Sequence, residues 1–323
     1  MPLVCNYYVT TRCNAKCAFC DIWQDNGQHA DTQEVLRNLK QLPSAGVRII
    51  DFTGGEPLLH RDLPRFLETA RRMGLQTTVT TNGLLYPKRA RQLQGLVDLL
   101  HLSIDGATAE VHDRYRSVPC FDSVMESIDV ALSLGERPDL LFTATAKNYR
   151  EIEPLIALAR SKGLIQIVNP VFESGGDLTL NSRQLEKLER ACKAPYVYIN
   201  GGVLKLMKEG GNDPDHPRCK AVSATLVISP DNKILLPCFH HADAKITIDG
   251  TLAEALQHPK RQKALQSQGR QEYCRGCTIN CYLAPSLPYR FDKYLANFLP
   301  WMAKYLYYKH FAKLTTRSSS HVT

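Results

Sequence analysis

Three cysteines stand close together near the start of the chain, at Cys13, Cys17 and Cys20. Their C-x3-C-x2-C spacing suits a loop wrapped around a compact metal centre, because thiolates select soft metals such as zinc or the iron of iron–sulfur clusters. A zinc ion would require a fourth ligand, and His29 is the only histidine or cysteine in the ten residues that follow. A cubic iron–sulfur cluster held by three cysteines keeps one iron open for chemistry. The spacing therefore favours such a cluster over three unrelated thiols.

A second group of five cysteines lies in the last third of the chain, at Cys219, Cys238, Cys274, Cys277 and Cys281. Residues 224–238 have the pattern of a β-hairpin, with apolar strands on either side of the turn at residues 230–232. Such a hairpin would bring Cys238 beside Cys219, and residues 274–281 would supply the other half of a metal cradle. The remaining cysteines lack partners at ligand spacing and are expected to be buried structural thiols. They are Cys5, Cys120 and Cys192.

The N-terminal stretch, including Phe19 just before the third cysteine, resembles the cluster-binding loop of the radical S-adenosylmethionine (radical SAM) superfamily. The resemblance implies that Cys13, Cys17 and Cys20 hold a [4Fe–4S] cluster whose open iron chelates the amino and carboxylate groups of SAM. It also implies that an electron from the cluster cleaves SAM to methionine and a 5′-deoxyadenosyl radical, which abstracts hydrogen from a substrate.

Two further segments resemble motifs of this family and would face SAM from the ends of strands. The sequence T-G-G-E-P at residues 53–57 resembles the G-G-E-P motif, which implies that Gly54, Gly55 and Glu56 contact the SAM amino group. The sequence T-N-G at residues 81–83 implies that Asn82 lines the SAM or substrate region. Taken alone, each segment would be an ordinary turn.

Two more segments follow the expected fourth strand. The sequence S-I-D-G at residues 103–106 resembles the S-x-D-G motif, so Ser103 and Asp105 would contact the SAM ribose or carboxylate. The sequence H-D-R-Y-R at residues 112–116 resembles the H-D-x-x-R segment of members with auxiliary clusters, so Arg116 would pair with the SAM carboxylate or a substrate anion. A surface ion-pair network is the alternative for Arg116. Asn148 is a weaker candidate for a ribose contact.

The second cysteine group resembles the SPASM domain, or the shorter twitch domain, of radical SAM enzymes. It departs from the full SPASM pattern, because only five cysteines are present and residues 274–281 read C-x2-C-x3-C. The resemblance therefore implies one auxiliary [4Fe–4S] cluster of the twitch type, held by Cys219, Cys238 and Cys274, with Cys277 preferred over Cys281 as the fourth ligand. A structural zinc site on the same thiols is the alternative.

Alternating strand-like and helix-like segments would position these loops and predict a parallel α/β sheet. The expected strands are residues 5–10, 48–53, 76–80, 99–104, 140–146 and 164–170, and the expected helices between and after them are residues 31–42, 63–73, 87–93, 123–134 and 152–162. A linking helix is expected at residues 180–192, and the glycine pairs at 201–202 and 210–211 are expected to mark breaks. The resemblance implies a partial (β/α)6 TIM-like barrel at residues 1–185, with SAM across the carboxyl ends of the strands, and a SPASM/twitch-like domain at residues 186–285.

The last segment, residues 286–323, is rich in aromatic residues interleaved with lysines. Its apolar residues fall at helical spacing, although Pro300 is expected to kink or interrupt the helix. Such a helix suits packing over the barrel, which we favour, and it also suits the plane of a membrane surface. A frayed polar end is expected at residues 317–323.

Composition narrows the function classes. The net charge is +8, but the basic residues form no stripe or recognition motif of a nucleic-acid-binding protein. Metal-like cysteine spacing without a signal-peptide pattern favours a reducing cytoplasm. No apolar run reaches about 18 residues, so no membrane span is predicted.

Together these observations predict a radical SAM enzyme that uses an auxiliary [4Fe–4S] cluster, for which an oxidative outcome such as dehydrogenation, hydroxylation or crosslinking is the natural one. The substrate would be a small molecule or a peptide, and a protein such as flavodoxin or ferredoxin would supply electrons. The alternatives are a hydroxylase or oxidase of a hydrophobic ring, such as a bacteriochlorophyllide-type pigment or a lipid, a peptide-modifying maturase, and a non-enzymatic metal-binding protein.

Overall fold

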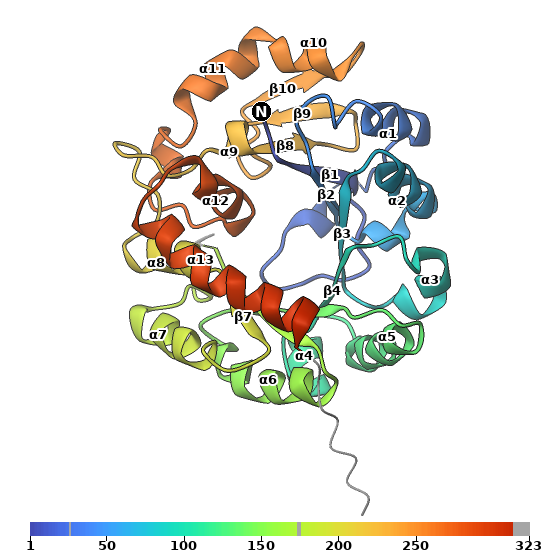
Figure 1. Cartoon of the computed structure of the whole chain (residues 1–323), viewed down its shortest axis with the longest axis vertical. Coiled ribbons are helices and arrows are strands. Elements are labelled where there is room, and N and C mark those ends of the chain that lie inside the picture. Colours follow the sequence, from blue (N-terminus) through green and yellow to red (C-terminus); the bar gives the residue numbers. More distant parts are fainter. Residues whose placement is uncertain (26, 173–175, 313–323) are drawn as a thin grey trace, which may run out of the picture.

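The computed structural model describes residues 1–25, 27–172 and 176–312, in which ten strands form one sheet (Figure 1). The strands are β1 (Val4–Thr10), β2 (Ile49–Gly54), β3 (Gln76–Thr81), β4 (Leu99–Ser103), β5 (Asp139–Ala144), β6 (Ile165–Pro170), β7 (Val197–Ile199), β8 (Thr225–Ile228), β9 (Lys233–Leu236) and β10 (Ala244–Thr247). Their order is β10-β9-β8-β1-β2-β3-β4-β5-β6-β7. The sheet curves without closing, since β7 and β10 are its two edges, so the molecule is a partial barrel.

The parallel part of the sheet extends further than the six expected strands. Strands β1 to β7 run parallel, and β8 joins them on the other side of β1, with Thr225 opposite Val4. The expected hairpin is confirmed as β8 and β9, and it continues the barrel sheet. The sheet therefore runs across residue 185, where the domain boundary was expected.

In Figure 1, α13 crosses the front of the barrel, whereas most of the other helices lie around the outside of the curved sheet. The described residues form thirteen α-helices. They are α1 (Thr32–Leu39), α2 (Leu63–Arg72), α3 (Tyr86–Leu93), α4 (Ala109–Arg116), α5 (Phe121–Ser133), α6 (Ile152–Ser161), α7 (Ser182–Ala191), α8 (Gly201–Lys208), α9 (Ala221–Ala224), α10 (Leu252–Gln257), α11 (Pro259–Ser267), α12 (Asn280–Ser286) and α13 (Lys293–Leu306). Short turns of other helix types are η1 (Ile22–Gln24), η2 (Pro57–Leu59), η3 (Tyr149–Glu151), η4 (Glu272–Cys274), η5 (Leu287–Tyr289) and η6 (Tyr307–Phe311). The expected helices are confirmed, with ends that differ by a few residues.

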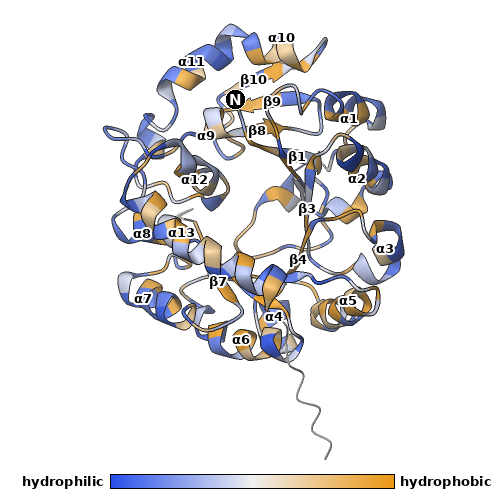
Figure 2. Ribbon diagram, in the orientation of Figure 1, coloured by the Kyte–Doolittle hydropathy of each residue, from blue (hydrophilic) through white to orange (hydrophobic). Residues whose placement is uncertain are grey.

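The two faces of the sheet differ in what covers them. On β1, Cys5, Tyr7 and Val9 are fully buried in the core that the sheet shares with the surrounding helices. The opposite, inner face carries side chains that keep partial exposure on each of the first seven strands. They are Tyr8, Asp51, Thr80, His101, Leu141, Asn169 and Tyr198. The inner face therefore carries both polar and apolar side chains, and on β7 Tyr198 packs against Tyr305. The outward surfaces of α1 and α2 are mostly hydrophilic (Figure 2).

The aromatic C-terminal helix α13 packs against α8 and β7. Gly201 permits this contact, because a Cβ atom there would lie 2.1 Å from Cδ1 of Trp301, so this glycine begins α8 instead of marking the expected break. The Tyr305 hydroxyl donates to Asp139 Oδ2 at 2.7 Å. The helix also continues through Pro300, which corrects the expected interruption. These contacts favour packing over the barrel.

The outer surface of this C-terminal segment keeps large apolar side chains exposed. They are Phe291, Leu299, Leu306, Tyr307 and Phe311. Within the described ranges, no helix combines the length and the apolar character that a membrane crossing requires. The frayed end expected at residues 317–323 lies outside the described residues.

Candidate functional site

The three N-terminal cysteines lie on a loop that follows β1 and is closed at its base. Thr11 N–H donates to Gln28 O at 2.9 Å, and Gln28 N–H donates to Thr11 Oγ1 at 2.9 Å. Cys17 is buried, Cys13 is half-buried and Cys20 is exposed. Burial raises the pKa of Cys13 to about 11, so a metal that binds this thiol would displace its proton.

The end of α4 holds this loop in place. Lys16 N–H donates to Arg116 O at 3.1 Å, and Ala18 N–H donates to Tyr115 O at 2.9 Å. The Arg116 side chain turns back over the loop, with Nη1 3.5 Å from Cys17 Sγ and the guanidinium carbon 5.4 Å from the centre of the Phe19 ring. A fixed positive charge therefore lies against one of the three thiols, which suits a loop that carries an anionic cluster.

Arg116 also forms a buried ion pair with Asp105, in which Nε lies 2.7 Å from Oδ2. Asp105 Oδ1 accepts from Thr143 N–H at 2.9 Å, and burial raises the pKa of this carboxyl although Arg116 opposes the shift. His112 supports the pair, because its Nδ1 accepts from Asp105 N–H at 3.0 Å. Asp105 and Arg116 therefore pair with each other in the interior, and the ion pair is not a surface one. Their direct contact with SAM stays a prediction.

The glycine pair after β2 packs against the end of β1. Gly54 has a φ of +139°, and a Cβ atom there would lie 1.9 Å from Thr10 O. Gly55 N–H donates to Thr10 O at 2.9 Å, and Glu56 N–H donates to Arg12 O at 2.8 Å. Only glycine allows β1 and this loop to approach so closely.

Glu56 links the loops that follow β2 and β3. Its buried carboxylate accepts from Leu58 N–H at 3.1 Å, from Thr81 Oγ1 at 2.8 Å and from Asn82 N–H at 2.8 Å. Asn82 Nδ2 in turn donates to Asn14 Oδ1 at 2.7 Å in the cysteine loop. Burial raises the pKa of Glu56, and these donors oppose the shift. The network brings three of the predicted segments together, while a contact between Glu56 and the SAM amino group stays a prediction.

The predicted site residues Ser103 and Asn148 differ in whether their side chains already form hydrogen bonds within the protein. Ser103 is buried at the carboxyl end of β4, and its hydroxyl has no hydrogen-bond partner within the described part of the chain, so it is free for a ligand. Asn148 is used by its own turn, since Oδ1 accepts from Thr145 N–H at 2.6 Å and Nδ2 donates to Thr143 O at 3.1 Å.

Four of the five C-terminal cysteines surround one cavity. Cys219, Cys238, Cys274 and Cys277 line it together with apolar and aromatic side chains. Burial raises the pKa of Cys219 and of Cys238 to about 12 and that of Cys274 to about 11. Four thiols around one cavity fit the ligand set of an iron–sulfur or zinc centre. Cys281 does not line the cavity and is exposed on the first turn of α12.

Asn212, which sequence reasoning missed, holds this cavity together. Its Nδ2 donates to Gly269 O at 2.9 Å and to Cys274 O at 3.1 Å. Its Oδ1 accepts from the backbone N–H of Arg218 at 2.8 Å and of Cys219 at 2.9 Å. One buried amide thus fixes the backbone at two of the four cysteines. No short-range pattern marks such a residue, because its partners lie up to 62 positions away.

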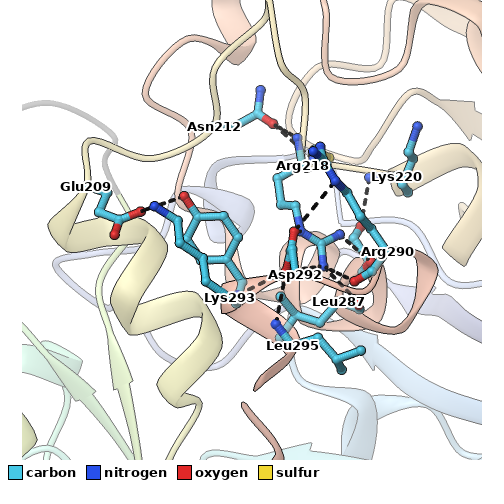
Figure 3. A network of polar contacts seen from close by, with 12 residues as sticks. Glu209, Asn212, Arg218, Lys220, Leu287, Arg290, Asp292, Lys293 and Leu295 are labelled. Carbon is cyan, nitrogen blue, oxygen red and sulfur yellow. Dashed lines mark hydrogen bonds and ion pairs between the residues drawn. The ribbon is translucent and has the colours of Figure 1, made fainter. Parts of the chain in front are cut away.

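Arg218 fastens the same region to the C-terminal helix (Figure 3). Its Nε lies 2.7 Å from Asp292 Oδ2, and its Nη atoms donate to Ser286 O at 3.0 Å and Leu287 O at 2.8 Å. Asp292 also caps α13 by accepting from Tyr294 N–H and Leu295 N–H. The ion pair between Arg218, which directly precedes Cys219, and Asp292 therefore connects the cysteine cavity to the start of α13.

Comparison with known proteins identifies the family. A model of the radical SAM superfamily matches residues 7–159. A probable GTP 3′,8-cyclase of Methanocella arvoryzae is 30% identical over 263 residues, which cover 75% of this chain and 83% of that protein. The chain belongs to the radical SAM superfamily. A probable GTP 3′,8-cyclase of Saccharolobus islandicus is 27% identical over 263 residues, covering 74% of this chain and 83% of that protein.

Solved radical SAM structures share the fold. Streptococcus suis SuiB bound to S-adenosylmethionine is 18% identical with a TM-score of 0.69, and the match covers 91% of this chain and 76% of that one. The enzyme anSMEcpe with bound AdoMet is 17% identical with a TM-score of 0.65, covering 95% of this chain and 97% of that one. Members of the superfamily bind a [4Fe–4S] cluster and SAM. The thiol trio beside Arg116 and the glycine loop against β1 fit these two groups.

Proposed function

We propose that the chain cleaves SAM reductively and abstracts a hydrogen atom from a substrate on the inner face of the barrel. The supporting observation is the meeting of four sequence segments at the carboxyl ends of β1 to β4: the cysteine loop, the Gly54–Glu56 loop, Asn82, and the Asp105–Arg116 pair. When bound, a [4Fe–4S] cluster on Cys13, Cys17 and Cys20 would supply the electron that cleaves SAM.

The chain's own residues then have distinct parts in this proposal. Arg116 balances charge at Cys17, the Gly54–Gly55 backbone shapes the floor of the SAM site, and Ser103 offers a free hydroxyl to SAM. We further propose that Cys219, Cys238, Cys274 and Cys277 would hold an auxiliary [4Fe–4S] cluster, which when bound would supply an electron acceptor for an oxidative outcome. A cytoplasmic reductant such as flavodoxin or ferredoxin would complete the system.

The test is 5′-deoxyadenosine formation by anaerobically reconstituted protein with dithionite. We expect the product from the wild-type protein and none from Cys13→Ala. Cys192→Ala is the matched control, because this thiol is fully buried at the end of α7, outside the predicted ligand sets, and the variant should leave product formation intact. Product from Cys13→Ala at the wild-type rate would refute the proposal.

A second candidate function comes from the relatives. Proteins that cover three quarters of this chain are named probable GTP 3′,8-cyclase, so GTP is a candidate substrate. Incubation of the reconstituted protein with GTP, SAM and dithionite would decide it, since consumption of GTP coupled to 5′-deoxyadenosine would support cyclase activity. Unchanged GTP in the presence of active SAM cleavage would exclude it.

A further inference from the structure

One carboxylate on the inner face of the barrel has no counter-charge. Asp51 lies on β2 between Ile50 and Phe52, which are fully buried on the helix-covered face, so its side chain projects from the opposite face. Its neighbours in register are the neutral residues Asn6 on β1 and Thr78 on β3. Its Oδ1 atom is covered by protein and has no hydrogen-bond partner within the described ranges.

The barrel supplies no cation for this group. Strands β1 to β8 contain no lysine or arginine, and their only acidic residues are Asp51 and Asp139. Asp139 is neutralised, because Lys309 Nζ lies 2.8 Å from its Oδ1 and Tyr305 donates to its Oδ2. Asp51 is therefore the one strand carboxylate of the described barrel that is left without a paired cation.

Asp51 lies on the side of β2 that is turned towards α12 and Tyr8. Although Cys281, on the first turn of α12, is an exposed residue, loss of water around its thiol and the charge of Asp51 raise its pKa to about 11. The same charge also contributes to the raised pKa of Tyr8. Tyr8 stacks on Phe239, next to Cys238, with ring centres 4.1 Å apart. Asp51 precedes the Gly54 loop by three residues, or about 10 Å of strand at about 3.3 Å per residue. This places it below the loops predicted to bind SAM, on the inner face that we propose as the substrate site.

We propose that Asp51 is the specificity residue of the substrate site, and that it binds a protonated amine of the substrate and disfavours phosphorylated molecules. A carboxylate oxygen that is covered by protein and has no partner is costly, and a cation brought by the substrate completes the pair. A phosphate would instead meet a like charge in a site whose strands carry no lysine or arginine. The inference rests on the proposed function in taking the inner face as the substrate site, and it argues against GTP.

The amine is tested by equilibrium dialysis of reconstituted protein with SAM and without reductant. The probes are cadaverine and pentane-1,5-diol, which have the same length but differ in charge. We expect saturable cadaverine binding that weakens about tenfold or more in Asp51→Asn, since one charge-assisted contact is lost. Asp129→Asn, which removes an exposed carboxylate on α5, should leave binding unchanged. Equal binding of the diol, or equal cadaverine binding by wild type and Asp51→Asn, would overturn the proposal.

The expected discrimination against phosphorylated molecules is tested with GTP and guanosine, which share a base and a ribose but differ in the phosphates. We expect wild-type protein to bind GTP no more tightly than guanosine, and Asp51→Lys to bind GTP about tenfold or more tightly than wild type. Wild-type protein that prefers GTP over guanosine, with no change in Asp51→Asn, would overturn the proposal.

Two measurements distinguish the proposed substrate role of Asp51 from a role in SAM binding and from the proposed function itself. The SAM dissociation constant of Asp51→Asn should equal that of wild type, whereas a weaker SAM complex would make Asp51 a SAM contact and overturn the proposal. Cadaverine binding is measured without turnover. Intact binding with no 5′-deoxyadenosine under dithionite would therefore refute the proposed function alone, and product formation without amine binding would refute this inference alone.

Discussion

Arg116 Nη1 lies 3.5 Å from Cys17 Sγ, while Nε of the same guanidinium lies 2.7 Å from Asp105 Oδ2. One side chain thus joins the carboxyl end of β4 to the cysteine loop, and Cys17 lies 99 positions before Arg116 in the sequence. Two functions meet in this residue: it neutralises a buried carboxylate, and it places a donor against the sulfur of Cys17, a proposed cluster ligand. The two can be separated by mutation.

We expect Arg116→Gln to lower the free energy of unfolding by about 3–5 kcal/mol, because Asp105 would stay buried without its partner. We also expect the N-terminal cluster to be harder to reduce, since hydrogen bonds to cluster sulfurs help to set the reduction potential. Denaturant unfolding of the metal-free protein measures the first effect, and an EPR-monitored redox titration measures the second.

The double variant Asp105→Asn/Arg116→Gln is the control. It removes both charges, so stability should recover while the potential stays low. Recovery of both quantities would mean that Arg116 acts on the cluster only through Asp105, which contradicts the direct contact with Cys17.

Gly54→Ala should prevent the glycine loop from closing on β1. The new Cβ atom would lie 1.9 Å from Thr10 O, and the φ of +139° is unfavourable for alanine. We expect loss of SAM binding and of cluster incorporation, measured by dialysis with labelled SAM and by iron analysis. Gly74→Ala is matched, because Gly74 also has a positive φ but open space around it. It should cost only about 1–2 kcal/mol of backbone strain and leave SAM binding intact. Normal SAM binding by Gly54→Ala would contradict the role of the close approach.

Local patterns in the sequence predicted most of the barrel and the position of its loops. Strands β1 to β6 alternate with helices at regular spacing, and the cysteine spacings and the Gly54–Gly55 pair are themselves local signals. What could not be predicted depends on distant partners. Strand β7 is only three residues long, and β8 joins the sheet by pairing with β1 from more than 200 residues away. The role of the buried Asn212 amide could not be predicted for the same reason, because its partners are also distant in the sequence.

Asp51 was missed for a related reason. In the sequence it is one charged residue in an apolar strand. That it has no paired cation becomes clear only when the other seven strands of β1 to β8, which carry no lysine or arginine, are assembled around it. Arg116 shows the converse, since its motif was recognised but its partners, Asp105 and Cys17, follow only from the fold.

Asp51 should make stability depend on pH. Burial raises its pKa from the ordinary 3.8 to about 7, so between these values the folded state holds a proton that the unfolded state has lost. Stability contributed by this proton is present at low pH and is lost as pH rises towards 7. We expect Asp51→Asn to gain stability relative to wild type between about pH 4 and 7, with no further gain above that range. Thermal unfolding of both proteins across this range measures the difference. A difference that stays constant with pH would show that Asp51 keeps an ordinary pKa in the fold.

The ligand set of the auxiliary centre can be resolved by comparing two neighbouring cysteines. Cys277 lines the cavity with three other thiols, whereas Cys281 is exposed on α12 near Asp51. If both proposed cubic clusters are present, wild-type protein should contain about eight iron atoms per chain, and Cys277→Ser should retain about four. Cys281→Ser should keep the wild-type iron and sulfide content, because its thiol lies outside the cavity. Iron loss in Cys281→Ser but not in Cys277→Ser would show that Cys281, and not Cys277, is the fourth ligand. Zinc without sulfide in the wild-type protein would show that the cavity holds a structural metal ion and not an iron–sulfur cluster.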